Sequence, residues 1–108
     1  MNQVSKTPAP PYYAVIFTSV RMPSVDGYAV MAQRMAKLSS QQEGFLGMEH
    51  ADNDDVSITI CYWDTTDAIA KWKQNVEHRA AQAGGYEKWY KSFTVRICKV
   101  ERDNTFER

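Results

Sequence analysis

The two histidines, His50 and His78, are the first candidates for acid–base chemistry in this sequence. Histidine exchanges its proton near neutral pH, so it can serve as a general acid or base. His78 follows Asn75 in a helical pattern, with Glu77 beside it to orient the ring. We expect the helix to break at Asn75, which would let His78 face a pocket as a base. An unbroken helix would turn His78 to the solvent, and a surface or structural role is the alternative.

Aromatic side chains are the second group with chemical potential. Three Trp, six Tyr and four Phe in 108 residues are a heavy load for a small core, so we expect some to line a pocket or an interface. Trp72 is predicted to act with His78 by holding a flat reactant. The predicted ligand-binding residues are Tyr90, Phe17, Tyr62 and Phe93. Packing in the core is the alternative for each.

Other chemistry has no support in the pattern. The sequence contains no HExxH, no CxxC and no glycine-rich phosphate loop, and Gly84-Gly85 fits the end of a helix. We therefore expect no metal and no cofactor. Thirteen Lys and Arg balance thirteen Asp and Glu, so the basic excess typical of nucleic-acid binding is absent.

The first residues and the cysteines bear on location. Residues 1–11 contain no apolar run of signal-peptide length, and the longest apolar stretch, 12–17, is far below the ~18 residues of a membrane helix. The sequence therefore predicts a cytoplasmic protein without a membrane partner. Cys61 and Cys98 lie in separate strand-like runs and are expected to be free thiols.

Periodicity divides the chain into an extended arm (1–11), one domain (12–102) and a charged tail (103–108). Asp26 is expected to cap a first helix that ends near Ser40, and Thr65 or Thr66 to cap a second that runs toward Ala83 with the break at Asn75. Residues rich in aromatic and β-branched side chains predict four strands: Tyr12–Val20, Phe45–Ala51, Ser57–Trp63 and Ser92–Val100.

The order strand–helix–strand–strand–helix–strand predicts a ferredoxin-like α+β fold, in which a four-stranded antiparallel sheet carries both helices on one face. Alternation assigns Ile58, Ile60, Tyr62, Phe93, Val95 and Ile97 to the helix side. The other side is mixed but too apolar for water, so we expect a homodimer through it. Trp63 and Arg96 are the predicted interface residues, Arg96 in an intersubunit pair or, alternatively, on an anionic ligand.

Several segments together resemble the antibiotic biosynthesis monooxygenase-like group of dimeric α+β barrel proteins, over about Tyr12 to Arg102. They are YYAVIFTSVR, the Gly-Phe-Leu-Gly at 44–47, ITICYW, AIAKWKQNVEHRAAQ and WYKSFTVRICKVER. The resemblance implies a homodimer whose two sheets close a barrel, and a pocket between sheet and helices. Some members oxygenate polycyclic aromatic molecules without metal or flavin, and others cleave haem.

The haem-cleaving branch fits less well. It uses an Asn of the first strand, a Trp of the second helix and a His further along that helical region. Trp72 matches the Trp, but residues 13–20 contain no Asn, and Gln82 stands near the place of the His.

The preferred interpretation is a cofactor-independent monooxygenase acting on a small flat aromatic molecule such as a quinol. Such a substrate, once deprotonated, supplies its own electrons to dioxygen. A non-catalytic binding or stress-response protein of the same fold is the alternative, and a haem protein the third.

Overall fold

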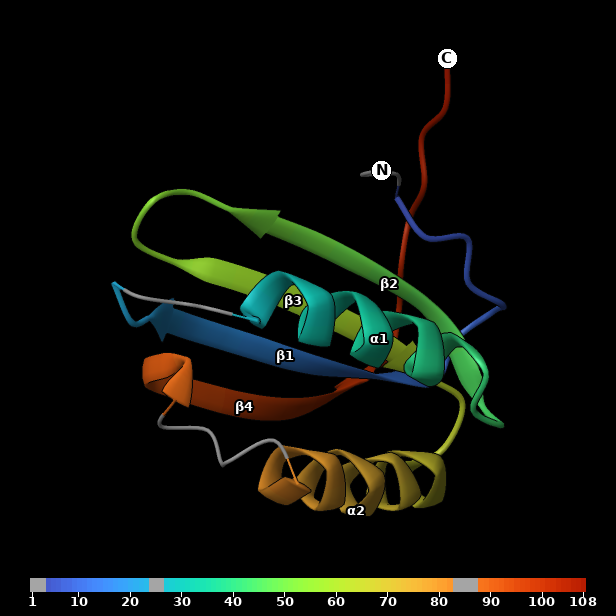
Figure 1. Ribbon diagram of the computed structural model, residues 1–108. Coiled ribbons are helices and arrows are strands. Elements are labelled where there is room, and N and C mark those ends of the chain that lie inside the picture. The colour runs from blue at the N-terminus through green and yellow to red at the C-terminus, as the bar shows by residue number, and fades with distance from the viewer. Residues whose placement is uncertain (1–3, 24–26, 83–87) are drawn as a thin grey trace.

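The computed structural model describes residues 4–23, 27–82 and 88–108, with the backbone alone for 78–82. Its strands form one antiparallel sheet in the order β2-β3-β1-β4, and both helices lie on the same face of it (Figure 1). The ferredoxin-like fold is thereby confirmed. The elements are β1 (Tyr12–Arg21), α1 (Tyr28–Ser40), β2 (Phe45–Asp52), β3 (Ser57–Trp63), α2 (Thr66–Gln82) and β4 (Tyr90–Val100).

Helix α1 follows its predicted pattern. It begins after Gly27, whose φ is 80°, and the expected cap at Asp26 lies outside the described residues. Its half-buried positions include Tyr28, Met31, Met35 and Leu38, the residues that a helical spacing of three and four places on one face.

Helix α2 begins as predicted but continues further. The Thr65 hydroxyl accepts a hydrogen bond from the Ala68 amide at 3.1 Å, which is an N-cap bond. The helix then runs unbroken to Gln82, so the break expected at Asn75 is wrong. Asn has only a mild helix penalty, and Lys73, Gln74 and Glu77 around it are good helix formers. Breaking the backbone hydrogen bonds at Asn75 would therefore bring no gain. Neither helix, within the described part of the chain, is long and apolar enough to span a bilayer.

The register of the sheet decides which side chains share a face. β1 lies between β3 and β4, where Val15 pairs with Cys61 and Ile97, and Phe17 pairs with Thr59 and Val95. Paired residues point to the same side of a sheet. Tyr13 points to the same side of β1 as Val15 and Phe17, and it pairs with Trp63. Because Trp63 contacts Trp72 of α2, this side is the helix-covered face.

The predicted faces of the third strand are therefore reversed. Ile58, Ile60 and Tyr62 point to the face without helices, which we call the open face. Cys61 and Trp63 point to the helices. The sequence shows that the residues of β3 alternate between two faces, but not which of the two sets points to the helices. Both sets are apolar enough to do so. The complete burial of Trp63 decides the outcome, because its large ring gains most from leaving water.

Gly44 brings the start of β2 against the start of α2. Its φ is 89°, a left-handed conformation that glycine adopts without strain. A Cβ at this position would lie 2.8 Å from Cβ of Ala68 and would also collide with the Asp64 carboxylate. The close approach therefore requires glycine.

Replacing Gly44 with Ala should destabilise the fold, because it adds both backbone strain and a collision. We expect Gly44→Ala to lower the free energy of unfolding by about 2–4 kcal/mol in urea denaturation. Gly27→Ala is the matched control, since Gly27 also has positive φ but a Cβ added there would meet no atom within 4 Å. Strain alone should cost about 1–2 kcal/mol there. Equal losses in the two variants would contradict the packing argument at Gly44.

Candidate functional site

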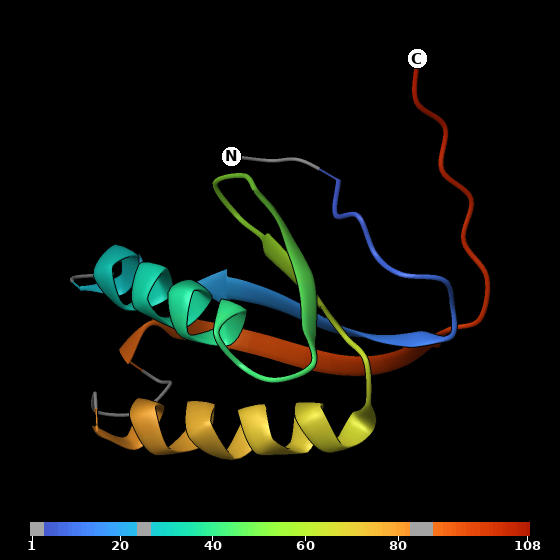
Figure 2. The same cartoon turned by 90° about the vertical axis from the view of Figure 1, so that its right-hand side faces the viewer.

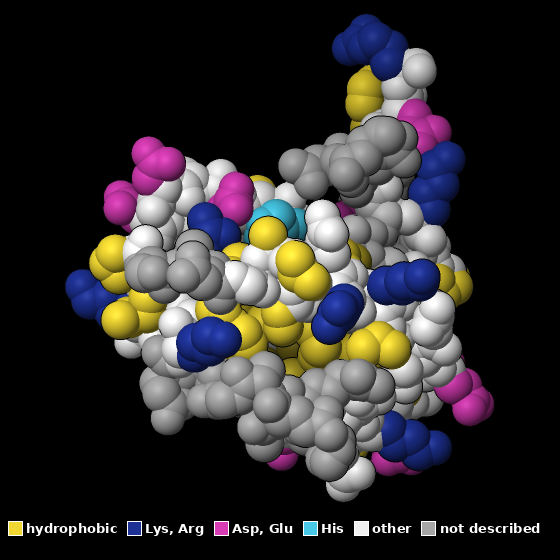
Figure 3. Space-filling model, viewed as in Figure 1, with side chains coloured by type: hydrophobic (Ala, Val, Ile, Leu, Met, Phe, Trp, Pro, Cys, Tyr) yellow, Lys and Arg dark blue, Asp and Glu magenta, His cyan; other side chains and the backbone are white. Residues whose placement is uncertain are grey.

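The helix-covered face leaves one stretch of apolar surface open. Phe93, Val95 and Ile97 point to the helix side of β4, yet they are 39%, 48% and 56% exposed. Helix α1 lies over the middle of the sheet and α2 lies along the β4 side (Figures 1 and 2). In the space-filling view, hydrophobic side chains line a hollow beside α1 (Figure 3). We call the surface formed by Phe17, Phe93, Val95 and Ile97 the apolar hollow.

Aromatic rings close one end of the apolar hollow. Tyr90 lies edge-on to Phe17, with ring centroids 5.4 Å apart, and edge-on to Tyr28 of α1 at 5.8 Å. Phe17 and Phe93 are 5.2 Å apart. Edge-to-face packing of this kind adds stability beyond the area buried. The structure thus brings together Tyr90, Phe17 and Phe93, three of the predicted ligand-binding residues.

Two tryptophans pack together further along the same face. Trp63 is wholly buried, with its ring 5.5 Å from Phe45 and 6.2 Å from Trp72. The predicted interface role of Trp63 is wrong, because the side chain lies beneath α2 within one chain. Trp72 is half-buried on the apolar side of α2, as its spacing predicted. The Trp63 Nε1 has no hydrogen-bond partner among the described residues, although buried donors are normally paired.

Tyr62 is separated from this group. It lies on the open face, where its hydroxyl donates a hydrogen bond to Oε1 of Glu49 at 2.7 Å and its ring meets Tyr12 edge-on. Burial and the Glu49 carboxylate raise the pKa of Tyr62, so the phenol stays protonated at neutral pH. The prediction that Tyr62 lies with the other ligand-binding residues is wrong, because the two faces of β3 are the reverse of those expected.

The two cysteines lie on opposite faces of the sheet. The strand order places β1 between them, as expected, and both are free. Cys61 faces the helices, and burial raises the pKa of its thiol to about 11. Because the thiolate is the nucleophilic form, Cys61 is unreactive at neutral pH. Cys98 is exposed on the open face.

His50 belongs to a polar cluster that the sequence did not indicate. Its Nδ1 lies 2.7 Å from the Thr59 hydroxyl and its Nε2 lies 3.5 Å from Asp52. Arg21 also donates to Asp52, at 3.3 Å, and this hydrogen bond is the main reason that the pKa of Asp52 is lowered. Both ring nitrogens of His50 are therefore occupied, and the cluster ties the far ends of β1 and β2 together.

The side chain of His78 lies outside the described residues, although the backbone there belongs to α2. The helix break that an inward-facing His78 required is absent. Its catalytic role stays a prediction.

A small groove lies elsewhere, at the start of α2. It encloses about 210 Å³, none of the predicted site residues line it, and its lining is Glu43, Asp64, Thr65, Asp67, Ala68 and Lys71. Within the part of the chain that the structure describes, no three His, Cys, Asp or Glu side chains gather in a way that would hold a metal ion. The apolar hollow is therefore the better candidate site.

Known proteins match the chain over nearly its whole length. The uncharacterised protein YqjZ of Bacillus subtilis is 47% identical over 108 residues, which cover 99% of this chain and 95% of YqjZ. The solved structure of PA3566 from Pseudomonas aeruginosa has a TM-score of 0.58 at 22% identity, and covers 90% of this chain and 99% of its own. A Bacillus cereus protein, provisionally described as an antibiotic biosynthesis monooxygenase, gives 0.56 at 14% identity, with 89% and 98% covered.

A model of the antibiotic biosynthesis monooxygenase family matches residues 11–84. That span includes β1 through α2, and so both helices and three of the four strands. The match covers more than half of the chain, and this chain therefore belongs to the antibiotic biosynthesis monooxygenase family.

Proposed function

We propose that the apolar hollow binds a small flat aromatic molecule, such as a quinol or a phenol with fused rings, and that the protein oxygenates it without a cofactor. The observation that supports the proposal is the exposed apolar floor of β4, on the face that the helices otherwise cover. Val95 and Ile97 are about half exposed there, beside the aromatic group of Phe17, Tyr90 and Phe93.

The size and character of this surface suit such a ligand. Residues 13 to 17 of β1 cover roughly 13 Å at the usual rise of a strand, and aromatic rings lie toward both ends of that length. Tyr90 adds a phenol at one end, where its hydroxyl can meet a polar substituent of the ligand. Flat apolar rings with one or two oxygens are the ligands that such walls favour.

The reaction needs little from the protein beyond binding and proton transfer. A deprotonated quinol or phenol passes electrons to dioxygen; one oxygen atom then joins a ring carbon and the other leaves as water with two hydrogens of the substrate. The protein orients the substrate, accepts a proton and excludes water. Cys61 stays a thiol at neutral pH and His50 is held by Thr59 and Asp52, so His78 is the proposed base.

A charge on the floor of the hollow should weaken ligand binding, whereas the same charge elsewhere on the surface should not. We expect Val95→Asp to weaken the binding of an anthrone-like phenol about 10- to 100-fold, because the carboxylate would lose water beside an apolar ring. Val30→Asp is the matched control: Val30 is 55% exposed against 48% for Val95, but it lies on α1 away from β4. Fluorescence titration measures both. Equal weakening, or none in either variant, would argue against the hollow as the site.

Oxygen uptake separates an enzyme from a binding protein. If His78 takes the proton, His78→Ala should lower turnover about 10²–10⁴-fold with little change in binding. Unchanged turnover in His78→Ala would remove this histidine from the mechanism. Saturable binding without oxygen uptake, over a panel of quinols and fused-ring phenols, would favour the non-catalytic alternative. The unbroken helix α2 supports the non-catalytic alternative, because His78 was expected to face the pocket only if the helix broke at Asn75.

We also propose that the open face forms a homodimer. Ile58 is 42% exposed on this face, and Ile16 and Ile60 are half-buried. One row across the sheet reads Glu49, Ile60, Ile16 and Arg96, from the β2 edge to the β4 edge. A two-fold axis parallel to the strands, between β3 and β1, would set Arg96 opposite Glu49 of a second copy. No ion pair of Arg96 occurs within the described part of the chain, so it is available for this contact.

Reversing the charge of Arg96 should therefore weaken the dimer. We expect Arg96→Glu to raise the dissociation constant about tenfold or more in sedimentation equilibrium, because like charges would then oppose each other. Lys99→Glu makes the same change on the same strand but on the helix-covered face, and should have little effect. Alkylation of Cys98 should also slow as protein concentration rises. A wild-type chain that stays monomeric at micromolar concentration would overturn the dimer.

A further inference from the structure

Charge is distributed unevenly over the molecule, although the chain as a whole has a formal net charge of zero. Helix α1 carries Arg34 and Lys37 and no acidic residue. In the space-filling view, Lys and Arg side chains lie on both sides of the apolar hollow, whereas the described acidic side chains lie further out (Figure 3). Most of the described acidic residues belong to three other places, which are the β2–β3 turn (Asp52, Asp54, Asp55), the surroundings of the small groove (Glu43, Asp64, Asp67) and the end of the chain (Glu101, Asp103, Glu107).

Lys99 continues the floor of the apolar hollow. It follows Phe93, Val95 and Ile97 on the helix-covered side of β4, and its partner on β1 is Tyr13. β4 is an edge strand, so no further strand lies beside Lys99. The side chain is exposed, and no ion pair of Lys99 occurs among the residues that the structure describes. The floor therefore ends in an ammonium group that is open to an anion.

The described acidic side chains of helix α2 are engaged elsewhere. Asp67 lines the small groove together with Lys71, and Glu77 lies 4.0 Å from Lys73. The row that runs across the sheet from Lys99 contains no acidic residue either. Its members are Tyr13, Trp63 and Phe45.

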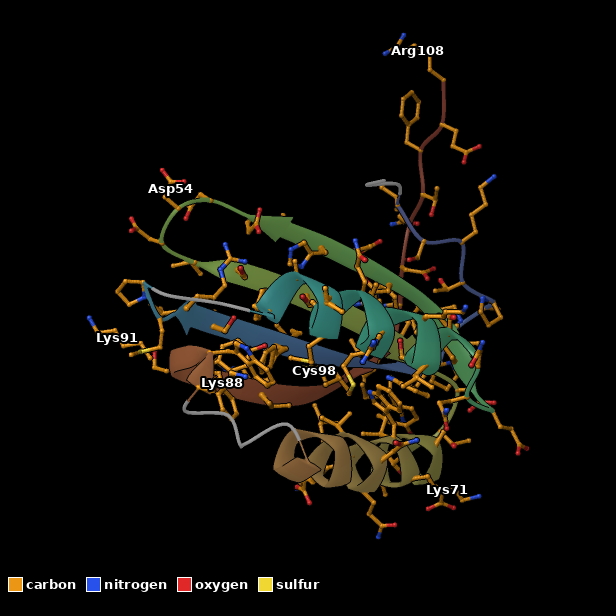
Figure 4. All side chains as sticks on the ribbon, viewed as in Figure 1. Asp54, Lys71, Lys88, Lys91, Cys98 and Arg108 are labelled. Atoms are coloured by element: carbon orange, nitrogen blue, oxygen red, sulfur yellow. The ribbon has the colours of Figure 1, made fainter. Side chains whose placement is uncertain are left out.

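A second cation lies at the opposite, aromatic end of the hollow. Lys88 precedes Trp89 and Tyr90 at the start of β4 (Figure 4), and its Nζ is 5.3 Å from the centre of the Trp89 ring. This cation–π contact leaves the positive charge in place. Positive groups at both ends of an apolar surface attract anions, because low-dielectric walls focus their field.

We propose that the ligand of the apolar hollow is an anion, a fused-ring aromatic carboxylate whose acid group pairs with Lys99. This inference rests on the proposed function and names the charge of its substrate. Val95 and Lys99 are four residues apart on one side of the strand, which is roughly 13 Å. A fused-ring skeleton fits on Val95 and Ile97 within that length, and the flexible lysine stem brings its ammonium group to the edge of the rings.

The size of the effect depends on how exposed the contact is. A fully exposed ion pair contributes little to affinity, because water screens it. Beside apolar walls the same pair is screened less, so we expect the carboxylate to improve binding about tenfold. The apolar floor contributes to the binding of neutral and acidic ligands alike.

The test uses two ligands that differ in charge, a hydroxynaphthoic acid and its methyl ester, which share the rings and the phenol. Wild-type protein should bind the acid about tenfold more tightly than the ester in fluorescence titration at neutral pH. Added salt should weaken the binding of the acid only. Lys99→Gln should remove the advantage of the acid and leave the binding of the ester unchanged.

Lys73→Gln is the matched control. It removes the same charge from α2, where Lys73 pairs with Glu77, and it should change the binding of neither ligand. Lys73 and Lys99 are both exposed, so thermal unfolding of the two variants should match wild type.

The outcomes separate this inference from the proposed site. Equal binding of acid and ester by the wild type, or an advantage of the acid that survives in Lys99→Gln, would overturn the anion inference and leave the hollow as the site. Val95→Asp should still weaken the binding of the ester in that case. Binding of neither ligand, or ester binding that ignores Val95→Asp, would overturn the proposed site and this inference with it.

Discussion

The two hydrogen-bonded ladders of β1 are the constraint on which the rest of the structure depends. β1 pairs with β3 along one edge and with β4 along the other, and each pairing assigns every side chain of three strands to one of two faces. Trp63 is thereby committed to the helices and Tyr62 to the open face. The aromatic cluster, the buried thiol of Cys61 and the phenol network around Glu49 all follow from these registers.

Position at the edge explains why β4 carries the candidate functions. Its residues from Lys91 to Lys99 are exposed, although they alternate between the two faces. On one face the helices leave Phe93, Val95 and Ile97 uncovered, and on the other Arg96 and Cys98 lie in the open. Under the two proposals above, a single strand contributes to the small-molecule site and to the subunit interface. The two surfaces differ in shape: one lies hollowed beside α1, whereas the other is a broad sheet face.

Polar side chains of β1, β2 and β3 hold both ends of the chain. Tyr62 donates to one oxygen of Glu49, and the Ser5 amide donates to the other at 2.9 Å. Tyr12 links Thr7 to Asp103, and the hydrogen bond to Asp103 is the main reason that its pKa is raised. These bonds hold the arm and the base of the tail beside the open face. They give segments with little apolar content a fixed course.

The sequence by itself determined the element order, the strand order around Cys61 and Cys98, and the apolar stripe of α1, because these depend on local periodicity and on short connections. It also grouped Tyr90, Phe17 and Phe93 correctly. It did not determine which half of β3 faces the helices, so Trp63 and Tyr62 were exchanged, and it predicted a break at Asn75 that α2 does not have. Only the tertiary structure decided those points. A strand with two apolar halves is oriented by the total area that packing buries, and a helix continues through a weak residue when its neighbours maintain the hydrogen bonds.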